Sequence, residues 1–387
     1  MHELSKCNAQ AMKKIRTAAC LFLLVTSSAY AKPLYDTAEV DLAMQAFMAD
    51  YGLPGSSIRL AKDGKVHMQK YYGNYSGSMR IPIASASKWL SALVLARLVE
   101  KGQLQWQDTV GEWIPDAPID KRAITLAQLF SHTSGLPGNE STSCLANRFI
   151  TLDNCASQIL NLNLESTPGS SFSYGGNSMQ VAGRLAEIAS GKNWNQLFYD
   201  ELVVPLGLSG TDFATSSTQE GYVWVGNPRI AGGVRSTQAD YGRVLDVLLA
   251  GGFDGTQSYL SVDTLAYMAY NQAAGKIILN TPSPETIGYG IGQWIEAIDA
   301  NGNTTRVSSP GAFGTTPWVD WAAGSNGIIF VQDQRTRIEA GLYQVQWLGI
   351  AALSKRSYVK PPIQQPQKYA ANQKPKRNTA LESGSNE

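Results

Sequence analysis

One nearly unbroken apolar helix, expected to begin near Ser85 in the stretch of residues 81–102, constrains the fold of this chain more than any other feature. From Trp89 to residue 99 the side chains are apolar almost all the way round the helix, and a polar last turn closes it before Gly102. A helix that is apolar on every side has to be covered on every side. We therefore expect it at the centre of a large domain.

The head of this helix carries a serine and a lysine three residues apart, Ser85 and Lys88. Residues with this spacing share one helical face, and Ser91 continues the same narrow polar stripe. Burial disfavours the ammonium form and can lower a lysine pKa by up to about 3 to 5 units, so Lys88 is a candidate base beside a hydroxyl. A serine beside a base is an activated nucleophile, and N–H groups at a helix amino terminus favour a developing oxyanion. The Ser-x-x-Lys pattern is short and also occurs by chance on solvated surfaces, so it needs support from the rest of the chain.

Size and composition indicate one large globular domain followed by a tail. With 387 residues, 43% of them apolar, the chain can bury a sizeable core. The formal net charge of +1 and the 16% share of charged residues argue against nucleic acid as a partner. Residues 356–387 are rich in Lys, Pro, Gln, Asn and Ser without periodicity, and we expect a disordered tail there.

Residues 1–31 predict a secretory signal peptide, with Met12 as the expected true start. A basic start and an apolar run lead to a small-x-small cleavage sequence that ends at Ala31. The apolar run is too short to cross a bilayer, so we expect a periplasmic or secreted protein with no integral membrane segment. Cys144 and Cys155 remain after cleavage, and in an oxidising compartment we expect them to be bonded to each other; two free buried thiols are the alternative.

Periodicity predicts strands near both ends of the chain and helices between them. The terminal strands are expected to pair into one antiparallel sheet, from about residues 52–75 and 288–345, beside a mostly helical lobe of about 86–287. The predicted fold class is therefore α+β, in one domain over residues 32–355. Helices are expected over residues 36–51, 177–190, 194–203, 237–250 and 345–353, and strands over 56–60, 66–72, 313–321, 327–331 and 337–343.

Three loops contain further candidate residues. His132 lies in a turn-rich stretch and is interpreted as a packing residue, because no Gly-x-Ser-x-Gly elbow accompanies it. Tyr174 stands on a glycine-flanked loop before a helix, where a phenol can approach a ligand; a core tyrosine is the alternative. Residues 308–320 open on a glycine-bearing turn and run into a strand, and the alternative there is an ordinary bulge. Two histidines and two cysteines after the signal peptide make a zinc site improbable.

In combination, these stretches resemble the serine β-lactamase and penicillin-binding protein superfamily, specifically its branch of class C β-lactamases, D-alanyl carboxypeptidases and esterases. The resemblance covers roughly residues 36–355 and implies the β-lactamase/transpeptidase-like fold. Four motifs carry it in order: Ser85-Ala86-Ser87-Lys88, then Leu129-Phe130-Ser131-His132-Thr133-Ser134-Gly135-Leu136, then Tyr174 before a helix, then Ser309-Pro310-Gly311.

The resemblance implies that Ser85 is the acylated nucleophile and that Lys88 and Tyr174 share the work of the general base. It also implies an oxyanion hole made by the backbone N–H groups of Ser85 and Ala312, with Gly311 beside them. Neither a metal nor an organic cofactor is expected. The expected partner is a small-molecule ester, β-lactam or peptide substrate, and the expected state is a monomer.

Two positions depart from the family pattern. In the Tyr-x-Asn motif, the third place is Gly176, and Asn177, which follows one residue later, is kept with Ser309 as a candidate substrate contact. Ser309 stands where the family usually has Lys or His. Both changes remove recognition of a peptide-like ligand with a carboxylate, which favours an esterase-like hydrolase. The alternatives are a β-lactamase or D-alanyl-D-alanine carboxypeptidase, and a non-catalytic penicillin-binding-like protein.

Overall fold

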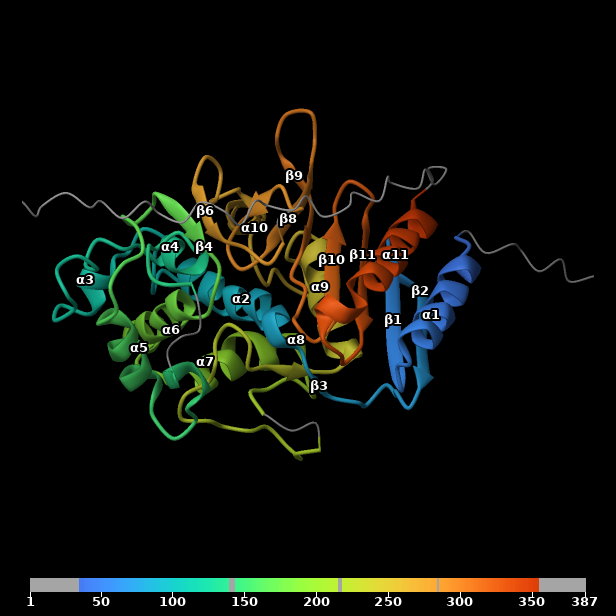
Figure 1. Cartoon of the computed structure of the whole chain (residues 1–387), viewed down its shortest axis with the longest axis horizontal. Helices are drawn as coiled ribbons and strands as arrows, with labels where there is room; N and C mark the ends of the chain where they lie inside the picture. Colours follow the sequence, from blue (N-terminus) through green and yellow to red (C-terminus); the bar gives the residue numbers. More distant parts are fainter. Residues whose placement is uncertain (1–34, 139–142, 215–217, 284, 355–387) are drawn as a thin grey trace, which may run out of the picture. The chain divides into compact units, whose positions relative to one another are not determined.

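The computed structural model describes residues 35–138, 143–214, 218–283 and 285–354 (Figure 1). The predicted signal peptide, the start at Met12 and the tail over residues 356–387 lie outside the described residues. Across the described ranges, none of the helices combines the length and the apolar composition that crossing a bilayer requires.

A seven-stranded antiparallel sheet is built from both ends of the chain, in the order β2-β1-β11-β10-β9-β8-β7. N-terminal β1 pairs with C-terminal β11, with Ser57 opposite Phe330, which confirms the predicted pairing of the terminal segments. Asp63 and Gly64 turn the first hairpin with φ of 50° and 72°, the left-handed values that an Asp-Gly turn adopts. The strands are β1 (Gly55–Lys62), β2 (Lys65–Gly73), β7 (Gly288–Tyr289), β8 (Trp294–Ile298), β9 (Thr304–Ser308), β10 (Thr316–Asp320) and β11 (Ser325–Phe330).

Both faces of the central strands are buried. Along β11, Ile328 and Phe330 face the helical part of the molecule, whereas Ile329 faces a smaller core under two terminal helices. Side chains alternate between the two faces of a strand, so a strand covered on both faces is apolar at successive positions. This explains why residues 327–331 appear in the sequence as a continuous apolar run.

The terminal helices α1 (Ala38–Tyr51) and α11 (Arg335–Leu353) pack together on the outer face of the sheet, beside β1 and β2 in Figure 1. Gly341 allows this approach, because a Cβ at that position would lie 2.4 Å from the Phe47 ring. The prediction of a strand over residues 337–343, with the sheet extending to 345, was wrong. Ile338, Leu342 and Val345 are buried at helical spacing, and the last strand ends at Phe330.

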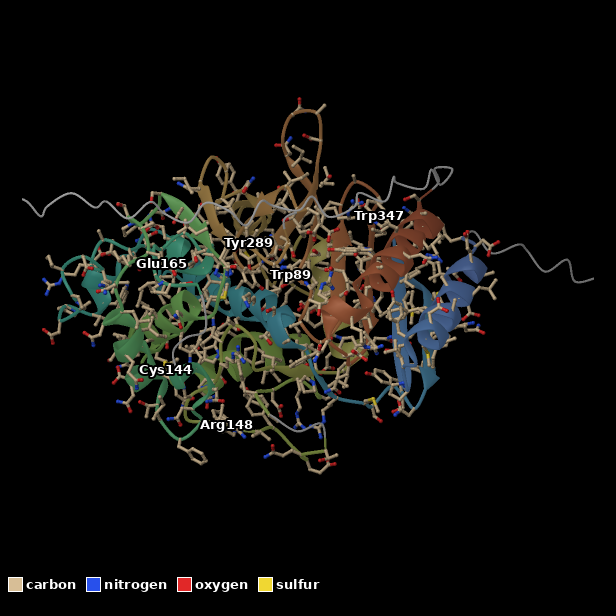
Figure 2. All side chains as sticks on the ribbon, in the orientation of Figure 1. Trp89, Cys144, Arg148, Glu165, Tyr289 and Trp347 are labelled. Atoms are coloured by element: carbon tan, nitrogen blue, oxygen red, sulfur yellow. A yellow bond between two sulfur atoms is a disulfide. The ribbon has the colours of Figure 1, made fainter. Side chains whose placement is uncertain are left out.

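The predicted central helix is α2 (Ser87–Glu100), and the structure confirms its burial. Residues 87–96 are all buried, and Trp89, labelled in Figure 2, is 1% exposed. The helix predicted over residues 177–190 is present as α6, and Thr237 caps α9 by accepting a hydrogen bond from the Asp240 N–H group. The other helices around α2 are α3 (Val110–Trp113), α4 (Leu126–Phe130), α5 (Leu152–Leu160), α6 (Asn177–Ser190), α7 (Trp194–Phe198), α8 (Val204–Leu206), α9 (Gln238–Leu249) and α10 (Val262–Ala269).

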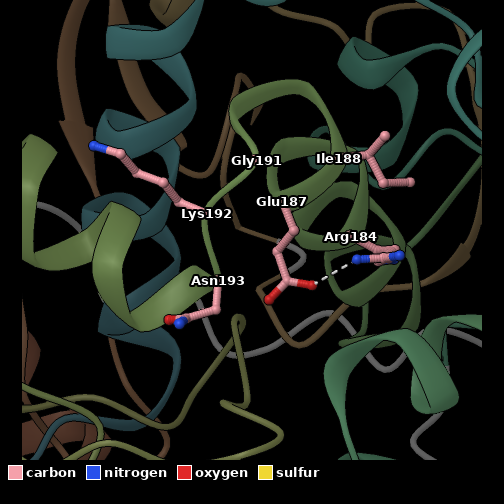
Figure 3. Close-up of a pocket in the computed structure, with 6 residues that line it drawn as sticks. All are labelled: Arg184, Glu187, Ile188, Gly191, Lys192 and Asn193. Atoms are coloured by element: carbon pink, nitrogen blue, oxygen red, sulfur yellow. Dashed lines mark hydrogen bonds and ion pairs between the residues drawn. The ribbon is translucent and has the colours of Figure 1, made fainter.

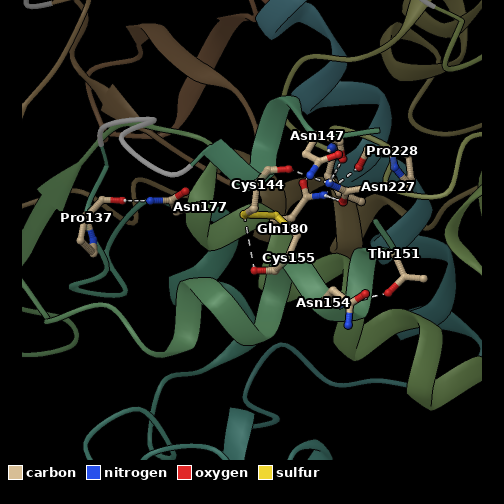
Figure 4. Close-up of a disulfide and its surroundings, with 11 residues drawn as sticks. Pro137, Cys144, Asn147, Thr151, Asn154, Cys155, Asn177, Gln180, Asn227 and Pro228 are labelled. Carbon is tan, nitrogen blue, oxygen red and sulfur yellow. Dashed lines mark hydrogen bonds between the residues drawn. A yellow bond between two sulfur atoms is a disulfide. The ribbon is translucent and has the colours of Figure 1, made fainter. Parts of the chain in front are cut away.

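A disulfide joins Cys144 to Cys155 in the helical part, with their Cα atoms 5.2 Å apart (Figure 4). Asn227 donates a hydrogen bond to the Cys144 carbonyl oxygen at 2.7 Å, and Gln180 of α6 donates to the Asn227 side chain at 2.7 Å. The bridge therefore belongs to a buried polar network that connects α5 and α6 to the segment before β5 (Arg235–Ser236).

A surface hollow lies around the end of α6, where Arg184 donates a hydrogen bond to Glu187 at 3.2 Å (Figure 3). Gly191, Lys192 and Asn193 also line it. It contains none of the candidate catalytic side chains that the sequence predicts.

Candidate active site

Ser85 lies in a tight turn that leads into α2. A single 3-10 turn, Ala84–Ala86, precedes the helix, and Ala84 has a φ of 46°, which is strained for a residue with a side chain. Ser87 holds this turn, since its hydroxyl donates to the Ala84 carbonyl oxygen at 2.6 Å and accepts from the Val234 N–H group at 3.1 Å. Ser85 remains partly exposed while its neighbours on both sides are buried. The turn therefore presents one hydroxyl to solvent.

Lys88 is buried beside this hydroxyl. Its Nζ atom lies 3.0 Å from Ser85 Oγ and 2.9 Å from the Ala231 carbonyl oxygen, and the side chain is 3% exposed. A neutral amine in this position can donate one N–H to Ala231 and direct its lone pair at the serine hydroxyl. Burial disfavours the charged form of the amine. The geometry therefore allows Lys88 to remove the Ser85 proton.

The Ala231 carbonyl belongs to a backbone segment over residues 230–234 that lies across the start of α2. Ser91 donates to the Ile230 carbonyl oxygen at 2.9 Å, and the Ile83 N–H group donates to the Val234 carbonyl oxygen at 2.9 Å. The sequence did not reveal this contact, because a backbone carbonyl leaves no side-chain signature.

Tyr174 is held over Lys88, with its ring centroid 4.6 Å from Nζ. It follows β4 (Ser171–Ser173) and pairs with Asn280 at the end of β6 (Ile277–Asn280), donating its N–H to the Asn280 carbonyl oxygen at 3.0 Å. Its ring stacks on Trp294, with centroids 5.2 Å apart and planes at 22°. The tyrosine is therefore fixed on its backbone side and on one ring face.

His132 also packs against Tyr174. The ring centroids of His132 and Tyr174 are 4.6 Å apart, and Tyr289, labelled in Figure 2, lies 4.9 Å from the imidazole. Burial holds the pKa of His132 well below its usual range. Within the described residues neither ring nitrogen has a hydrogen-bond partner, so His132 is a neutral packing ring.

The turn after β9 brings the predicted third motif to Ser85. Ser309 Oγ lies 3.4 Å from the Ser85 carbonyl oxygen and 3.4 Å from that of Gly292. A Cβ on Gly311 would lie 2.1 Å from the Ile83 carbonyl oxygen, so only glycine allows the turn to approach so closely. Ala312 follows directly and is exposed. The N–H groups of Ser85 and Ala312 are therefore carried by neighbouring turns.

Asn177 does not join this group. It is the first residue of α6 and is fully buried, and its side chain donates to the Pro137 carbonyl oxygen at 3.0 Å (Figure 4). In this conformation it supports the loop after α4, and a substrate cannot reach it. Gly176, at the place where the family has asparagine, caps α6.

Among the side chains in the described ranges, no three His, Cys, Asp or Glu residues come together as metal ligands would.

Comparisons with known proteins agree with the fold that carries these residues. The chain matches the family described as Beta-lactamase over residues 40–358. A solved structure of a candidate β-lactamase from Bacteroides dorei DSM 17855 is 33% identical, with a TM-score of 0.70, over 78% of this chain and 92% of that one. A family VIII carboxylesterase shares the fold at 18% identity and a TM-score of 0.63, over 79% of this chain and 96% of that one. Penicillin-binding protein 4 of Amycolatopsis lactamdurans is 28% identical over 192 residues, which are 45% of this chain and 48% of that protein.

The chain spans less than half the length of the curated relatives it matches. The family match itself extends over most of the chain, and the structural likeness to the Bacteroides dorei protein covers 78% of it. The protein therefore belongs to the β-lactamase family.

Proposed function

We propose that this protein is a secreted serine hydrolase that forms an acyl-enzyme on Ser85 and acts mainly on esters and other small acyl compounds. The observation that carries the proposal is the contact of 3.0 Å between the buried Lys88 amine and the partly exposed Ser85 hydroxyl. A nucleophile and a base within hydrogen-bond reach are the minimum requirement for this chemistry.

In the proposed reaction, Ser85 Oγ attacks the ester carbonyl carbon while Lys88 Nζ accepts the hydroxyl proton. The Ala231 carbonyl accepts a hydrogen bond from the same amine and orients its lone pair toward Ser85. The N–H groups of Ser85 and Ala312 would stabilise the oxyanion. The proton then passes to the leaving alkoxide, with Tyr174 assisting, and water releases the acid in a second step that uses the same groups.

Ester substrates fit the site better than substrates with a carboxylate. Ser309 provides a neutral hydroxyl where the family usually has a cation, and its side chain is 3% exposed. The side chain of Asn177 is buried against Pro137 and is not available to a substrate amide. Loss of one positioned donor commonly costs about 10² to 10³ in rate, which is enough to change which substrates are turned over.

The test is steady-state hydrolysis of p-nitrophenyl acetate by protein that begins at residue 32, compared with its Ser85→Ala variant. Ser78→Ala, an exposed serine on the loop after β2, is the matched control. We expect turnover in the wild type and the control and none in Ser85→Ala. A folded wild-type protein without turnover, or equal turnover in Ser85→Ala, would refute the proposal.

β-lactam acylation is the second candidate, supported by the 33% identity to the Bacteroides dorei protein. It would give a mass increase on incubation with benzylpenicillin that Ser85→Ala abolishes.

Secretion is part of the proposal because residues 12–31 have the pattern of a signal peptide and because a disulfide suits an oxidising compartment.

A further inference from the structure

Gln180 of α6 is fully buried, and its side-chain amide is bonded to a single stretch of chain (Figure 4). Its Nε2 atom donates to Asn227 Oδ1 at 2.7 Å and to the Pro228 carbonyl oxygen at 2.9 Å. Its Oε1 atom accepts from the Ile230 N–H group at 3.2 Å. A buried amide is costly unless it is hydrogen-bonded, and these three bonds all go to residues 227–230. The Gln180 side chain therefore holds this segment against α6.

The orientation of the Gln180 amide follows from its partners. Asn227 donates through its own NH₂ group to the Cys144 carbonyl oxygen at 2.7 Å, so its Oδ1 atom is the one that faces Gln180. The Pro228 carbonyl oxygen can only accept. Both contacts require the NH₂ group of Gln180, which leaves its Oε1 atom for the Ile230 N–H group. Turning the amide over would place donor against donor at Ile230.

The segment that Gln180 holds brings the Ala231 carbonyl to Lys88. Ile230 is fixed through both of its backbone polar groups, because its N–H donates to Gln180 and its carbonyl oxygen accepts from Ser91 Oγ at 2.9 Å. The next carbonyl along the chain belongs to Ala231, and it accepts from Lys88 Nζ at 2.9 Å. One side chain from α6 and one from α2 thus hold the backbone directly before this carbonyl.

We propose that Gln180 is a positioning residue for the general base. It holds the Ala231 carbonyl where this carbonyl directs the lone pair of the Lys88 amine toward the nucleophile. The inference rests on the proposed function of Ser85. Gln180 is 0% exposed, so a substrate cannot reach it, and its loss should slow proton transfer without weakening substrate binding. Because misplacing reacting groups by about 1 Å can cost about 10² in rate, we expect kcat to fall about tenfold to a hundredfold.

The first experiment measures kcat and KM for p-nitrophenyl acetate in Gln180→Met, which keeps the length of the side chain and removes its hydrogen bonds. The control is Gln346→Met, because Gln346 of α11 is also a buried glutamine, 3% exposed, and donates to Glu296 at 3.3 Å. We expect kcat to fall about tenfold or more in Gln180→Met, with KM within about twofold of the wild type, and both constants to be unchanged in the control. Unaltered kcat in Gln180→Met, or an equal fall in the control, overturns the inference.

A double variant separates positioning of the base from a general effect on the fold. In Lys88→Met the base is already absent, so adding Gln180→Met should lower kcat no further. A further fall of about tenfold in the double variant would show that Gln180 acts independently of Lys88 and would overturn the inference. If Gln180→Met does not fold, Gln180→Glu, which loses the NH₂ group, takes its place and is judged by the same outcomes.

A structural measurement decides the inference if there is no turnover to measure. A wild type that does not hydrolyse the ester refutes the proposed function, and crystal structures of the two methionine variants then test Gln180 alone. The distance from Lys88 Nζ to the Ala231 carbonyl oxygen should exceed about 3.5 Å, beyond hydrogen-bond reach, in Gln180→Met. It should stay at 2.9 Å in Gln346→Met. An unaltered distance in Gln180→Met would overturn the inference.

Discussion

At the scale of single residues, Lys88 is the group on which the proposed chemistry depends. Two oxygens, Ser85 Oγ and the Ala231 carbonyl oxygen, lie within 3.0 Å of its amine, and the Tyr174 ring covers it. Each of these contacts restricts the direction of the amine lone pair. The rate of acylation should therefore depend on this one nitrogen far more than on the surrounding apolar surface.

Replacing Lys88 by methionine should abolish proton transfer while keeping the length of the side chain. We expect kcat/KM for p-nitrophenyl acetate to fall by about 10² to 10⁴, the usual contribution of a general base. The exposed Lys65→Met on β2 is the control and should behave as the wild type. Circular dichroism checks the fold, and a folded Lys88→Met protein with wild-type kcat/KM would exclude Lys88 as the base.

His132 gives a prediction about acid stability. Its pKa is lowered in the folded protein, mainly by burial, whereas the unfolded chain has the ordinary value near 6.5. Below about pH 6.5 the unfolded state therefore binds a proton that the folded state does not, and the free energy of unfolding falls by up to about 1.4 kcal/mol per pH unit. Above that pH this contribution is constant.

His132→Asn should remove the loss of stability that His132 causes at low pH. Asparagine tolerates the left-handed φ of 60° at this position. Urea unfolding between pH 7 and pH 5 should show a shallower loss of stability in the variant than in the wild type. The comparison uses slopes, so the cost of removing the ring does not affect it. Identical slopes would mean that His132 takes up its proton equally in the folded and unfolded states, which would contradict the lowered pKa.

At this scale the sequence predicts that Ser85 and Lys88 are neighbours, but it does not predict the residues that surround them. Ser85 and Lys88 could be identified because helical spacing fixes which side chains are neighbours. The contacts of Ala231 and Trp294 depend on how distant segments pack, and no local pattern encodes them. Asn177 shows the converse: its type and position suggested a substrate contact, but its amide is used inside the fold.

At the scale of elements, the turn after β9 positions Ala312, whose N–H group is one of the two proposed oxyanion groups. Gly311 lies against the backbone of Ile83, two residues before the nucleophile, so a Cβ at 2.1 Å from the Ile83 carbonyl oxygen forces one of the two turns to move. Misplacing reacting groups by about 1 Å can cost about 10² in rate. A substitution in this turn should therefore lower kcat more than it lowers the stability of the folded protein.

Gly311→Ala should lower kcat for p-nitrophenyl acetate about 10²-fold. Gly232→Ala is the control, because its Cβ would also lie near Ala84 but no closer than 3.7 Å to any atom. It should keep most of the activity. Equal kcat in Gly311→Ala and the wild type would show that the turn does not position the oxyanion groups.

Among the elements, α11 shows where the spacing of apolar residues was not enough to distinguish a helix from a strand. Residues 337–343 alternate apolar and polar side chains closely enough to suggest a strand, and Ile338 and Leu342 fit both a strand and a helix. Only the continuation to Val345 and beyond distinguishes the two periods. By contrast, the helices over residues 177–190 and 237–250 were predicted, because their signals are local.

At the scale of the whole molecule, the site depends on pairing between the two ends of the chain. Strand β1 pairs with β11, and β11 pairs in turn with β10, so the turn between β9 and β10 is held in the sheet while Ser85 is held by α2. The contacts of Ser309 with Ser85 and of Gly311 with Ile83 join these two parts. The α+β class could be predicted from the order of strands and helices along the sequence. The distances between the motifs could be obtained only from the folded structure.

The central claim is that Ser85 becomes acylated, and rapid quenching followed by mass spectrometry tests it directly. Protein mixed with excess p-nitrophenyl octanoate and quenched in acid within milliseconds should contain one added acyl group, on the peptide that includes Ser85. The adduct should be absent from Ser85→Ala. Turnover of the ester with no adduct on that peptide, or an adduct that persists in Ser85→Ala, would contradict the account.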